Sequence, residues 1–466
     1  MEDKETFGLS RRQFLILGGQ GLAAAAVLAA CGPQATEAPP EEPGEEPVEA
    51  PPAAEAVTIS YLGWPDTADL PAWETLSEMY MERNPNVTIE MTQAAGGGDE
   101  HYMKLQTMVA GGSPPHIAGF QGWEFQPFAD KGALAAIDDY VARDGFTDPF
   151  PEGVNTIEIC TKRKGKLYLI PLQMGTMVMF YAKQPFDEAG IPYPTDDWTY
   201  EEFLDIAQKL TDIDARKYGL RANGIWPRDI HYIRGTGKQE FDELVDPHTA
   251  QFNQPEIVEA VQTVAYDVYH TLQISPTAAD LEGGANEFQT GNCAMKYEGA
   301  WWFPQMMSPE LQEQGKGIPF DVVLMPKQQD EARPHRGWSE GVCLMKSDQE
   351  DAAWEYVKFM AGEEGDKVYS EITGRVPNSF SLLESFWIPM IKERFGVENG
   401  KAFMEAFKRS EFDVIGGVSR TQMWTEVVKP VAWDPMLNGS ATAAEVLPKV
   451  DEGVQAMLDE YWAAQS

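Results

Sequence analysis

Residues 57–110 decide the fold and read VTISYLGWPDTADLPAWETLSEMYMERNPNVTIEMTQAAGGGDEHYMKLQTMVA. The run Val57–Leu62 is rich in β-branched residues and ends at a glycine, which predicts a short strand. Apolar residues then recur every three or four positions from Leu70 to Tyr80, which predicts a helix. A second strand at Val87–Met91 and a further helix at Tyr102–Ala110 follow. This order of strand, helix, strand and helix predicts an α/β fold with a mainly parallel sheet.

The rest of the chain keeps this alternation. Strands are predicted at residues 167–171, 177–181, 294–297, 321–325 and 342–345. Helices are predicted at residues 199–210, 257–272 and 347–360. Capping boxes at Thr199–Glu202 and Ser347–Glu350 open the first and the last of these helices. Beyond Pro377 the chain is predicted to be mostly helical.

Length and charge exclude some classes of protein. The chain has 466 residues, enough for two or three domain-sized units. Asp and Glu number 74 against 36 Lys and Arg, so the formal net charge is −38. Nucleic acids are bound by clustered basic side chains, and the longest basic run here is Lys162–Lys164. The composition therefore argues against a nucleic-acid-binding protein and against a polybasic protein of the membrane surface.

The N-terminus has the features of an export signal. Ser10–Leu15 resembles the twin-arginine motif, and an apolar stretch follows from Phe14 to Ala30. The stretch ends in Leu28-Ala29-Ala30-Cys31, which resembles a bacterial lipobox. We therefore expect a signal peptide at residues 1–30 and a diacylglycerol on Cys31. The alternative is an uncleaved anchor helix, and the export route stays open between the twin-arginine and general secretion pathways.

Residues 31–56 predict a disordered tether behind the lipidated cysteine. Pro, Glu and Ala dominate this segment, which holds no aromatic and no basic residue. Such a composition cannot bury enough apolar surface to offset the entropy of ordering. The protein is therefore expected to be exported and anchored to the outer face of the cytoplasmic membrane through Cys31.

The motifs of enzymes and metal sites are incomplete in this sequence. Gly337–Gly341 matches G-x-S-x-G, but the stretch before it is polar and a strand-like run follows, which inverts the context of a nucleophile elbow. The six His residues show no metal-ligand spacing, and no CxxC occurs, so no metal and no cofactor are expected. Cys160, Cys293 and Cys343 are interpreted as buried thiols, with at most one disulfide among them.

Several tryptophans lie where predicted strands give way to loops. They are Trp64, Trp123, Trp226, Trp301 and Trp338. Ligands of open α/β sheets bind beyond the carboxyl ends of the strands. There, an indole face can stack on the C–H face of a sugar ring while polar neighbours bind its hydroxyls. The alternative for each tryptophan is packing in a core or under a loop.

Four blocks of sequence resemble a known family, the extracellular solute-binding proteins of family 1, which are the maltose-binding-protein-like receptors of ABC sugar importers. The blocks are Lys104–Pro115, Gly165–Thr199, Phe288–Trp301 and Ala352–Pro377. Two positions depart from the family pattern, since His116 replaces the usual acid and Ala182 replaces a frequent Asn. The resemblance runs from about Val57 to Trp462.

The resemblance implies a two-lobe periplasmic-binding-protein fold with a multi-strand hinge and a cleft between the lobes. One lobe would hold residues 57–172 and 327–375, and the other residues 177–323 and 377–466. The chain would cross between them near residues 172–176, 324–327 and 376.

The resemblance also implies which residues line the cleft. The expected ligand-binding residues are Trp64, Asp66, Gln121, Trp123, Met174, Thr176, Glu298, Trp301, Trp338, Ser339, Glu340 and Arg375, with Trp226 added from its place after a loop. No catalytic residue is expected.

The predicted function is that of a monomeric receptor that captures a carbohydrate by lobe closure and delivers it to an ABC permease. Three alternatives stay open. The same fold could bind a polyamine, another cation or a glycerol-phosphate-type solute. The protein could be a secreted hydrolase that uses two carboxylates or Ser339, or a surface receptor for adhesion or signalling that works without a permease.

Overall fold

The computed structural model describes residues 55–465, except 65, 67, 151–153, 282–287, 307–316 and 329–333. The predicted signal peptide, Cys31 and nearly all of the tether lie outside the described residues. The chain from Ala54 onward forms one compact unit. Within the described part, no helix combines the length and the apolar character that crossing a membrane requires.

Nine strands form one mixed sheet, and two more form a small hairpin. The sheet strands are β1 (Val57–Gly63), β2 (Val87–Gln93), β3 (Ile117–Gln121), β6 (Leu169–Ala182), β7 (Tyr218–Arg221), β8 (Cys293–Gly299), β9 (Phe320–Val323), β10 (His335–Leu344) and β11 (Ser410–Glu411). The hairpin consists of β4 (Lys162–Arg163) and β5 (Lys166–Leu167). The order across the sheet is β2-β1-β3-β10-β6-β8-β7, with β9 paired to β6 and β11 to β10.

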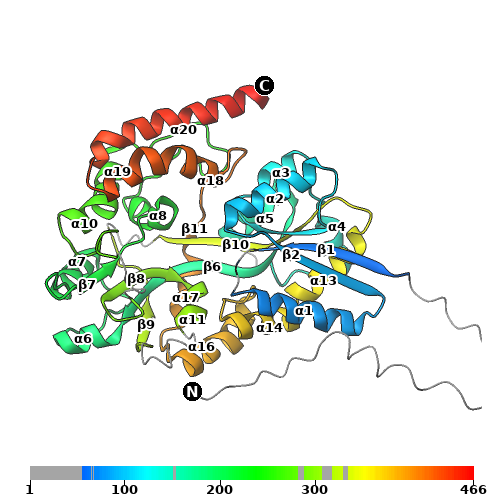
Figure 1. Ribbon diagram of the computed structural model, residues 1–466, viewed down its shortest axis with the longest axis horizontal. Coiled ribbons are helices and arrows are strands. Elements are labelled where there is room, and N and C mark those ends of the chain that lie inside the picture. The colour runs from blue at the N-terminus through cyan, green and yellow to red at the C-terminus, as the bar shows by residue number, and fades with distance from the viewer. Residues whose placement is uncertain are drawn as a thin grey trace, which may run out of the picture. The chain divides into compact units, whose positions relative to one another are not determined.

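The strand directions divide this sheet into two parts. β1 runs parallel to β2 and β3, and β7 runs parallel to β8. The long strands β6 and β10 are antiparallel to each other and lie between these parallel groups (Figure 1). The first half of β6 pairs with β10, and the second half pairs with β8 and β9. β6 therefore belongs to both parts of the sheet.

Helices cover the sheet and make up most of the remaining chain (Figure 1). The first group is α1 (Leu70–Arg83), α2 (Gly98–Ala110), α3 (Gln126–Asp130), α4 (Asp138–Asp144), α5 (Asn155–Thr161), α6 (Lys183–Ala189), α7 (Tyr200–Lys209), α8 (Trp226–Arg234), α9 (Pro255–Gln262), η1 (Thr263–Asp267), α10 (Val268–His270), η2 (Ala300–Trp302) and α11 (Phe303–Met306). The second group is α13 (Glu350–Ala361), α14 (Glu363–Thr373), α15 (Phe380–Leu382), η4 (Leu383–Trp387), α16 (Ile388–Phe395), α17 (Lys401–Lys408), α18 (Arg420–Met423), η5 (Trp424–Trp433), α19 (Asp434–Leu437) and α20 (Ala443–Gln465).

Alternate residues of β6 face two different hydrophobic cores. Met177, Met179 and Tyr181 pack in the core that includes residues of α7–α9 and α20. Val178 and Phe180 pack in the core that includes residues of α16 and α17. Because successive strand side chains point to opposite faces, this part of the sheet has helices on both faces. The β1–β3 part is covered in the same way by α1 and α13 on one face and by α2 and α3 on the other.

The α/β prediction is confirmed, with differences at the ends of several elements. The strands predicted at 167–171 and 177–181 are joined in β6, and the strand predicted at 342–345 begins earlier, at His335. The capping box at Thr199–Glu202 is present, with Glu202 N donating to Thr199 Oγ1 at 3.2 Å. The helix expected from Ser347 begins at Glu350, and Glu350 instead accepts a bond from Ser347 N at 3.2 Å.

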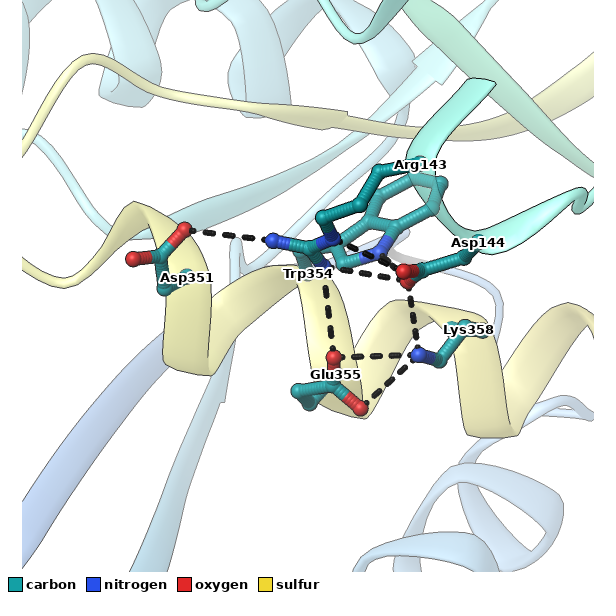
Figure 2. Close-up of polar contacts among 6 residues, drawn as sticks. All are labelled: Arg143, Asp144, Asp351, Trp354, Glu355 and Lys358. Atoms are coloured by element: carbon teal, nitrogen blue, oxygen red, sulfur yellow. Dashed lines mark hydrogen bonds and ion pairs between the residues drawn. The ribbon is translucent and has the colours of Figure 1, made fainter. Parts of the chain in front are cut away.

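An ionic cluster joins α4 to α13, as Figure 2 shows. Asp144, the last residue of α4, accepts hydrogen bonds from Trp354 Nε1 at 2.7 Å and from Lys358 Nζ at 2.8 Å. Arg143 donates to Asp144 at 2.7 Å and to Glu355 at 3.5 Å. These bonds hold the pKa of Asp144 far below its usual range, the bond from Arg143 first among them.

Candidate ligand-binding site

A pocket of about 300 Å³ brings together residues from strands β3 and β10, from the helical segments α8, η2, α18 and η5, and from the loops between such elements. Its lining residues are Trp64, Asp66, Gln121, Trp123, Ile225, Pro227, Arg228, Trp301, Arg336, Trp338, Glu340, Arg375, Arg420 and Trp424. This volume lies at the lower end of the range for small-molecule sites. Eight of the residues expected from the sequence are in this lining, namely Trp64, Asp66, Gln121, Trp123, Trp301, Trp338, Glu340 and Arg375.

Strand alternation explains which residues of β10 reach the pocket. Arg336, Trp338 and Glu340 line it, and they are separated by two positions along an extended strand. Ser339 therefore points to the opposite face, where it is buried. The expectation that Ser339 contacts the ligand is not supported by this geometry.

Met174 and Thr176 are placed by the same register. Met174 pairs with Ser339, and Gly175 pairs with Trp338, so Met174 lies on the face of the sheet that turns away from the pocket. Its side chain packs in a hydrophobic core. Thr176 is buried too and donates its hydroxyl to Arg336 O at 3.1 Å. Neither residue lines the pocket.

Two glycines allow indole rings to lie flat against the backbone. A Cβ atom on Gly175 would lie 2.2 Å from Cε2 of Trp338. A Cβ atom on Gly299 would lie 1.9 Å from Cζ3 of Trp301. Both distances are too short for any side chain, so these two positions fix how the tryptophans lie in the pocket wall.

Indole and guanidinium groups alternate along one wall. The Arg336 guanidinium lies 4.3 Å from the ring centroid of Trp338 and 4.9 Å from that of Trp123. Arg420 lies 4.4 Å from the Trp123 centroid. These contacts occupy Trp123 and Trp338, which are 2% and 4% exposed, so both rings serve to hold the arginines. Trp301 stays partly exposed.

The other wall is acidic. Arg375 bonds to Asp66 and donates Nε to Asp69 at 2.7 Å. Glu340 is buried nearby and accepts a bond from Trp338 Nε1 at 3.3 Å. Burial raises the pKa of Glu340 to about 7, because the charged form loses its hydration and the Arg375 charge offsets only part of this cost.

Two further expected residues, besides Met174, Thr176 and Ser339, lie outside the pocket. Trp226 is buried in a core, packs on Phe252 with ring centroids 5.2 Å apart, and donates Nε1 to Glu240 at 2.8 Å. Its interpretation as a ligand contact is not supported by this position. Glu298 is 1% exposed and pairs with Arg228 at 2.9 Å and Lys296 at 3.0 Å. Glu298 therefore positions Arg228, which lines the pocket, but does not line the pocket itself.

Six lining residues were missed from the sequence: Ile225, Pro227, Arg228, Arg336, Arg420 and Trp424. Arg336 could have been found, because it precedes Trp338 by two positions on a strand. Arg420 and Trp424 are four apart in consecutive helical segments and share a face. The residues of α8 and the loop before it carry no comparable signal, since tertiary packing alone brings them to the pocket.

The surroundings of Ser339 and of the three cysteines are not those of an activated nucleophile. Gly337–Gly341 lies inside β10, so no strand-turn-helix elbow forms, and Ser339 Oγ has no hydrogen-bond partner. Cys160, Cys293 and Cys343 are buried thiols, as expected, and burial raises the pKa of Cys160 to about 12. Among the described residues, no three His, Cys, Asp or Glu side chains gather as metal ligands would.

Comparisons with known proteins agree with this fold. An uncharacterised extracellular-binding protein of an ABC transporter from Pyrococcus horikoshii is 26% identical over 412 residues, which cover 81% of this chain and 88% of that protein. The ABC substrate-binding protein from Listeria monocytogenes, solved in complex with cycloalternan, matches with a TM-score of 0.75 at 22% identity and covers 87% of this chain and 100% of its own.

A receptor from Streptomyces glaucescens, solved unliganded and with acarbose, has a TM-score of 0.71 at 20% identity and covers 87% of this chain and 99% of its own. These structures confirm the two-lobe periplasmic-binding-protein fold. The sequence model of the bacterial extracellular solute-binding proteins matches residues 64–367, well over half of the chain. The chain therefore belongs to the family of bacterial extracellular solute-binding proteins.

Proposed function

We propose that this protein captures a carbohydrate in the Trp-lined pocket and delivers it to an ABC permease. No reaction is involved, because a receptor of this kind uses its binding energy to shift the equilibrium between open and closed lobes. The similar proteins from Listeria monocytogenes and Streptomyces glaucescens were solved with cycloalternan and acarbose, which is consistent with this proposal.

One observation carries the proposal. Trp64, Trp301 and Trp424 line the pocket and are partly exposed, so part of each indole is accessible to a ligand. The side chains of Asp66, Gln121 and Glu340 lie in the same lining and offer acceptors for hydroxyl groups. Accessible aromatic surfaces beside a few polar groups suit a sugar ring, which has apolar C–H faces and a polar edge.

The lobe boundaries are part of this proposal. One lobe would hold residues 57–172 and 327–375, and the other 177–323 and 377–466, with crossings near 172–176 and 376. The second crossing, expected at 324–327, fits better within β10, because Lys327 still bonds to Trp198 O at 2.9 Å and to Tyr200 N at 2.8 Å. β10 pairs with β3 on one side and with β6 on the other, and β6 extends into the second part of the sheet.

The site of action is also proposed. The twin-arginine-like motif, the lipobox and the tether support export and anchoring to the outer face of the cytoplasmic membrane through Cys31. We propose a monomer, with the permease as its protein partner. Mass spectrometry of the protein from membranes tests the anchor, because the lipidated chain would begin at Cys31 and carry a diacylglycerol.

The test of sugar binding is a calorimetric comparison of single variants. A thermal-shift screen against sugars, polyamines and glycerol phosphates first finds a ligand, since a ligand that binds only the folded state raises the midpoint. Trp301→Ala should then weaken sugar binding about tenfold or more, because stacking on the accessible part of the indole is lost. Trp462→Ala is the control, because Trp462 stacks on His248 outside the pocket. Unchanged affinity in the Trp301 variant would refute stacking.

A further inference from the structure

The pocket carries more guanidinium groups than its sugar-binding role requires. Arg228, Arg336, Arg375 and Arg420 all line it, against the two carboxylates Asp66 and Glu340. Arg375 is paired with Asp66 and Asp69, so its charge is neutralised within the acidic wall. The other three arginines come from α8, β10 and α18, and β10 also carries Glu340 of the acidic wall.

Arg228 offers free donors to the pocket. Its Nη1 atom bonds to Glu298 at 2.9 Å, and its side chain is 32% exposed. The guanidinium lies over the ring of Trp301, 5.6 Å from its centroid. Glu298 is shared with Lys296, so a single carboxylate serves two cations at this point.

Arg420 is in a similar position. Asp413 accepts two hydrogen bonds from Arg336, at 3.1 and 2.7 Å, and a longer one from Arg420 at 3.4 Å. Nε of Arg420 is buried and has no hydrogen-bond partner. A buried donor without an acceptor is costly, so an acceptor from a ligand would be well placed to bind here.

Charge is divided unevenly around the pocket. Three carboxylates, Asp66, Asp69 and Glu340, surround the single cation Arg375 on the acidic wall. Four cations, Arg228, Lys296, Arg336 and Arg420, face three carboxylates, Glu298, Asp413 and Glu124. Burial raises the pKa of Glu124 and likewise lowers the pKa of Lys296 and of Arg420. Beside Trp301, Arg228 and Lys296 share the single carboxylate of Glu298.

We propose that the natural ligand is a saccharide that carries an anionic group, the carboxylate of a uronic acid or a sulfate or phosphate ester, held by Arg228 and Arg420. This inference rests on the proposed carbohydrate-binding function and names its substrate class. Guanidinium groups match the oxygens of such anions in geometry as well as charge.

The acidic wall fixes how such a ligand lies. Asp66 and Glu340 repel an anion and accept hydroxyl hydrogen bonds, so the neutral rings face them. The anionic group faces the arginines. The same guanidinium groups disfavour a polyamine, although the net charge of −38 for the whole chain points toward cations.

The test uses matched ligand pairs that differ only in charge. Calorimetry on the purified protein compares oligogalacturonates with their methyl esters, and sulfated and phosphorylated sugars with the parent sugars. The anionic member of at least one pair should bind ten times or more tighter than its neutral partner, and its affinity should fall with added salt. A comparison of the carboxylate, sulfate and phosphate pairs then shows which of these anionic groups the protein binds.

Variants connect this preference to the named arginines. Arg228→Gln and Arg420→Gln should each lose about tenfold to a hundredfold in affinity for the anionic member and lose less for the neutral one, so that the ratio between the two affinities falls toward one. Lys296 and Arg336 still pair with the remaining carboxylates in these variants. Arg83→Gln, which removes an exposed charge paired with Glu364 far along the chain, is the control.

Sulfate ion serves as a minimal probe if no saccharide of the panel binds. Sulfate should raise the unfolding midpoint of the wild-type protein and of Arg83→Gln more than that of the Arg228→Gln, Arg420→Gln double variant. An equal shift in all three, or a neutral sugar that binds as tightly as its charged partner, overturns the inference. Tight binding of a neutral sugar leaves the proposed function intact, whereas binding of polyamines alone refutes both.

Discussion

At the scale of single residues, the pocket depends on two glycines, whose lack of a side chain leaves room for indole rings. Gly175 lies under the ring of Trp338, and Gly299 lies under Trp301. In each case a methyl group would occupy the space of an indole, so the ring would have to leave the wall. Trp338 in turn packs on Arg336, so the effect would spread to the guanidinium that it holds.

Gly175→Ala should therefore destabilise the fold by about 1–3 kcal/mol, the usual cost of forcing extra volume into a packed site. Denaturant unfolding measures this change. Gly97→Ala is the control, because the nearest atom to its Cβ would be 3.7 Å away. Equal stability of the two variants would mean that Trp338 moves aside at no cost.

Glu340 should make stability depend on pH. Its pKa rises from 4.5 in an exposed chain to about 7 in the fold, so the folded state holds a proton that the unfolded state has released. The free energy of unfolding of the ligand-free protein should fall as pH rises from about 4.5 to about 7, by on the order of 3 kcal/mol from this group.

Glu340→Gln keeps an acceptor for Trp338 and cannot titrate. Unfolding of both proteins at pH 5 and pH 8 isolates the contribution, because other acids such as Asp69 titrate in both. The wild-type protein should lose more stability than the variant between these pH values. Parallel pH profiles would contradict the assignment.

At the scale of elements, α4 is held to α13 mainly through one carboxylate. Asp144 accepts bonds from Trp354, Lys358 and Arg143, which lie around it in Figure 2. The indole is otherwise buried against Tyr140, with ring centroids 5.3 Å apart. Asp144 thus satisfies the one polar atom of a core tryptophan.

Asp144→Asn should lower the unfolding midpoint, because the amide keeps one acceptor and loses the charge that Lys358 and Arg143 require. Thermal unfolding at low and high salt measures the loss, which should shrink as salt screens the wild-type pairs. Asp351→Asn is the matched control, since that carboxylate is 86% exposed and 3.9 Å from Arg143. An equal change in both variants would show that the charge of Asp144 contributes no more than that of an exposed carboxylate.

The elements of the β1–β3 part were predicted well because each strand and helix there has its own periodicity. The long strands were harder. Gln173 and Thr176 interrupt the apolar run of β6, yet both are buried where β6 pairs with β10. The polar start of β10 is similar, since His335 and Arg336 are buried beside Met177 and Asp413. Polar residues with partners supplied by distant segments leave no periodic signal.

At the scale of the whole molecule, β6 and β10 join the two parts of the sheet, with one register shift in their pairing at Glu340 and Gly341. Their mutual pairing extends from Leu169 to Thr176 on one strand and from Gly337 to Cys343 on the other. Lobe closure of the proposed kind must therefore bend or twist these strands while their hydrogen bonds are kept.

Hydrogen exchange should show this directly. Amides of β6 and β10 in the paired region should be strongly protected with and without ligand, because the strands stay paired. Protection that changes on ligand binding should appear instead at the pocket segments around Trp64, Trp301 and Arg420. Loss of protection in β6 on binding would mean that closure breaks the sheet.

The candidate site was predicted where it follows strand ends and missed where it depends on tertiary convergence. Trp64 and Trp301 follow predicted strands, so their place in the pocket could be inferred. Arg228 is brought to it by the packing of α8 against distant segments, and no local pattern marks it. Trp226 is the opposite case, because it was predicted to contact the ligand from its place beside a loop but is buried in a hydrophobic core.

The indoles of Trp123, Trp338 and Trp301 stand in sequence, with centroid separations of 5.7 and 5.5 Å. Chromophores this close share their electronic excitation, so the cluster should give a strong near-ultraviolet circular dichroism couplet in the resting protein. A ring stacked on Trp301 would change the local polarity and tilt of one member. The protein therefore contains its own optical reporter, with which occupancy could be followed in real time without a label.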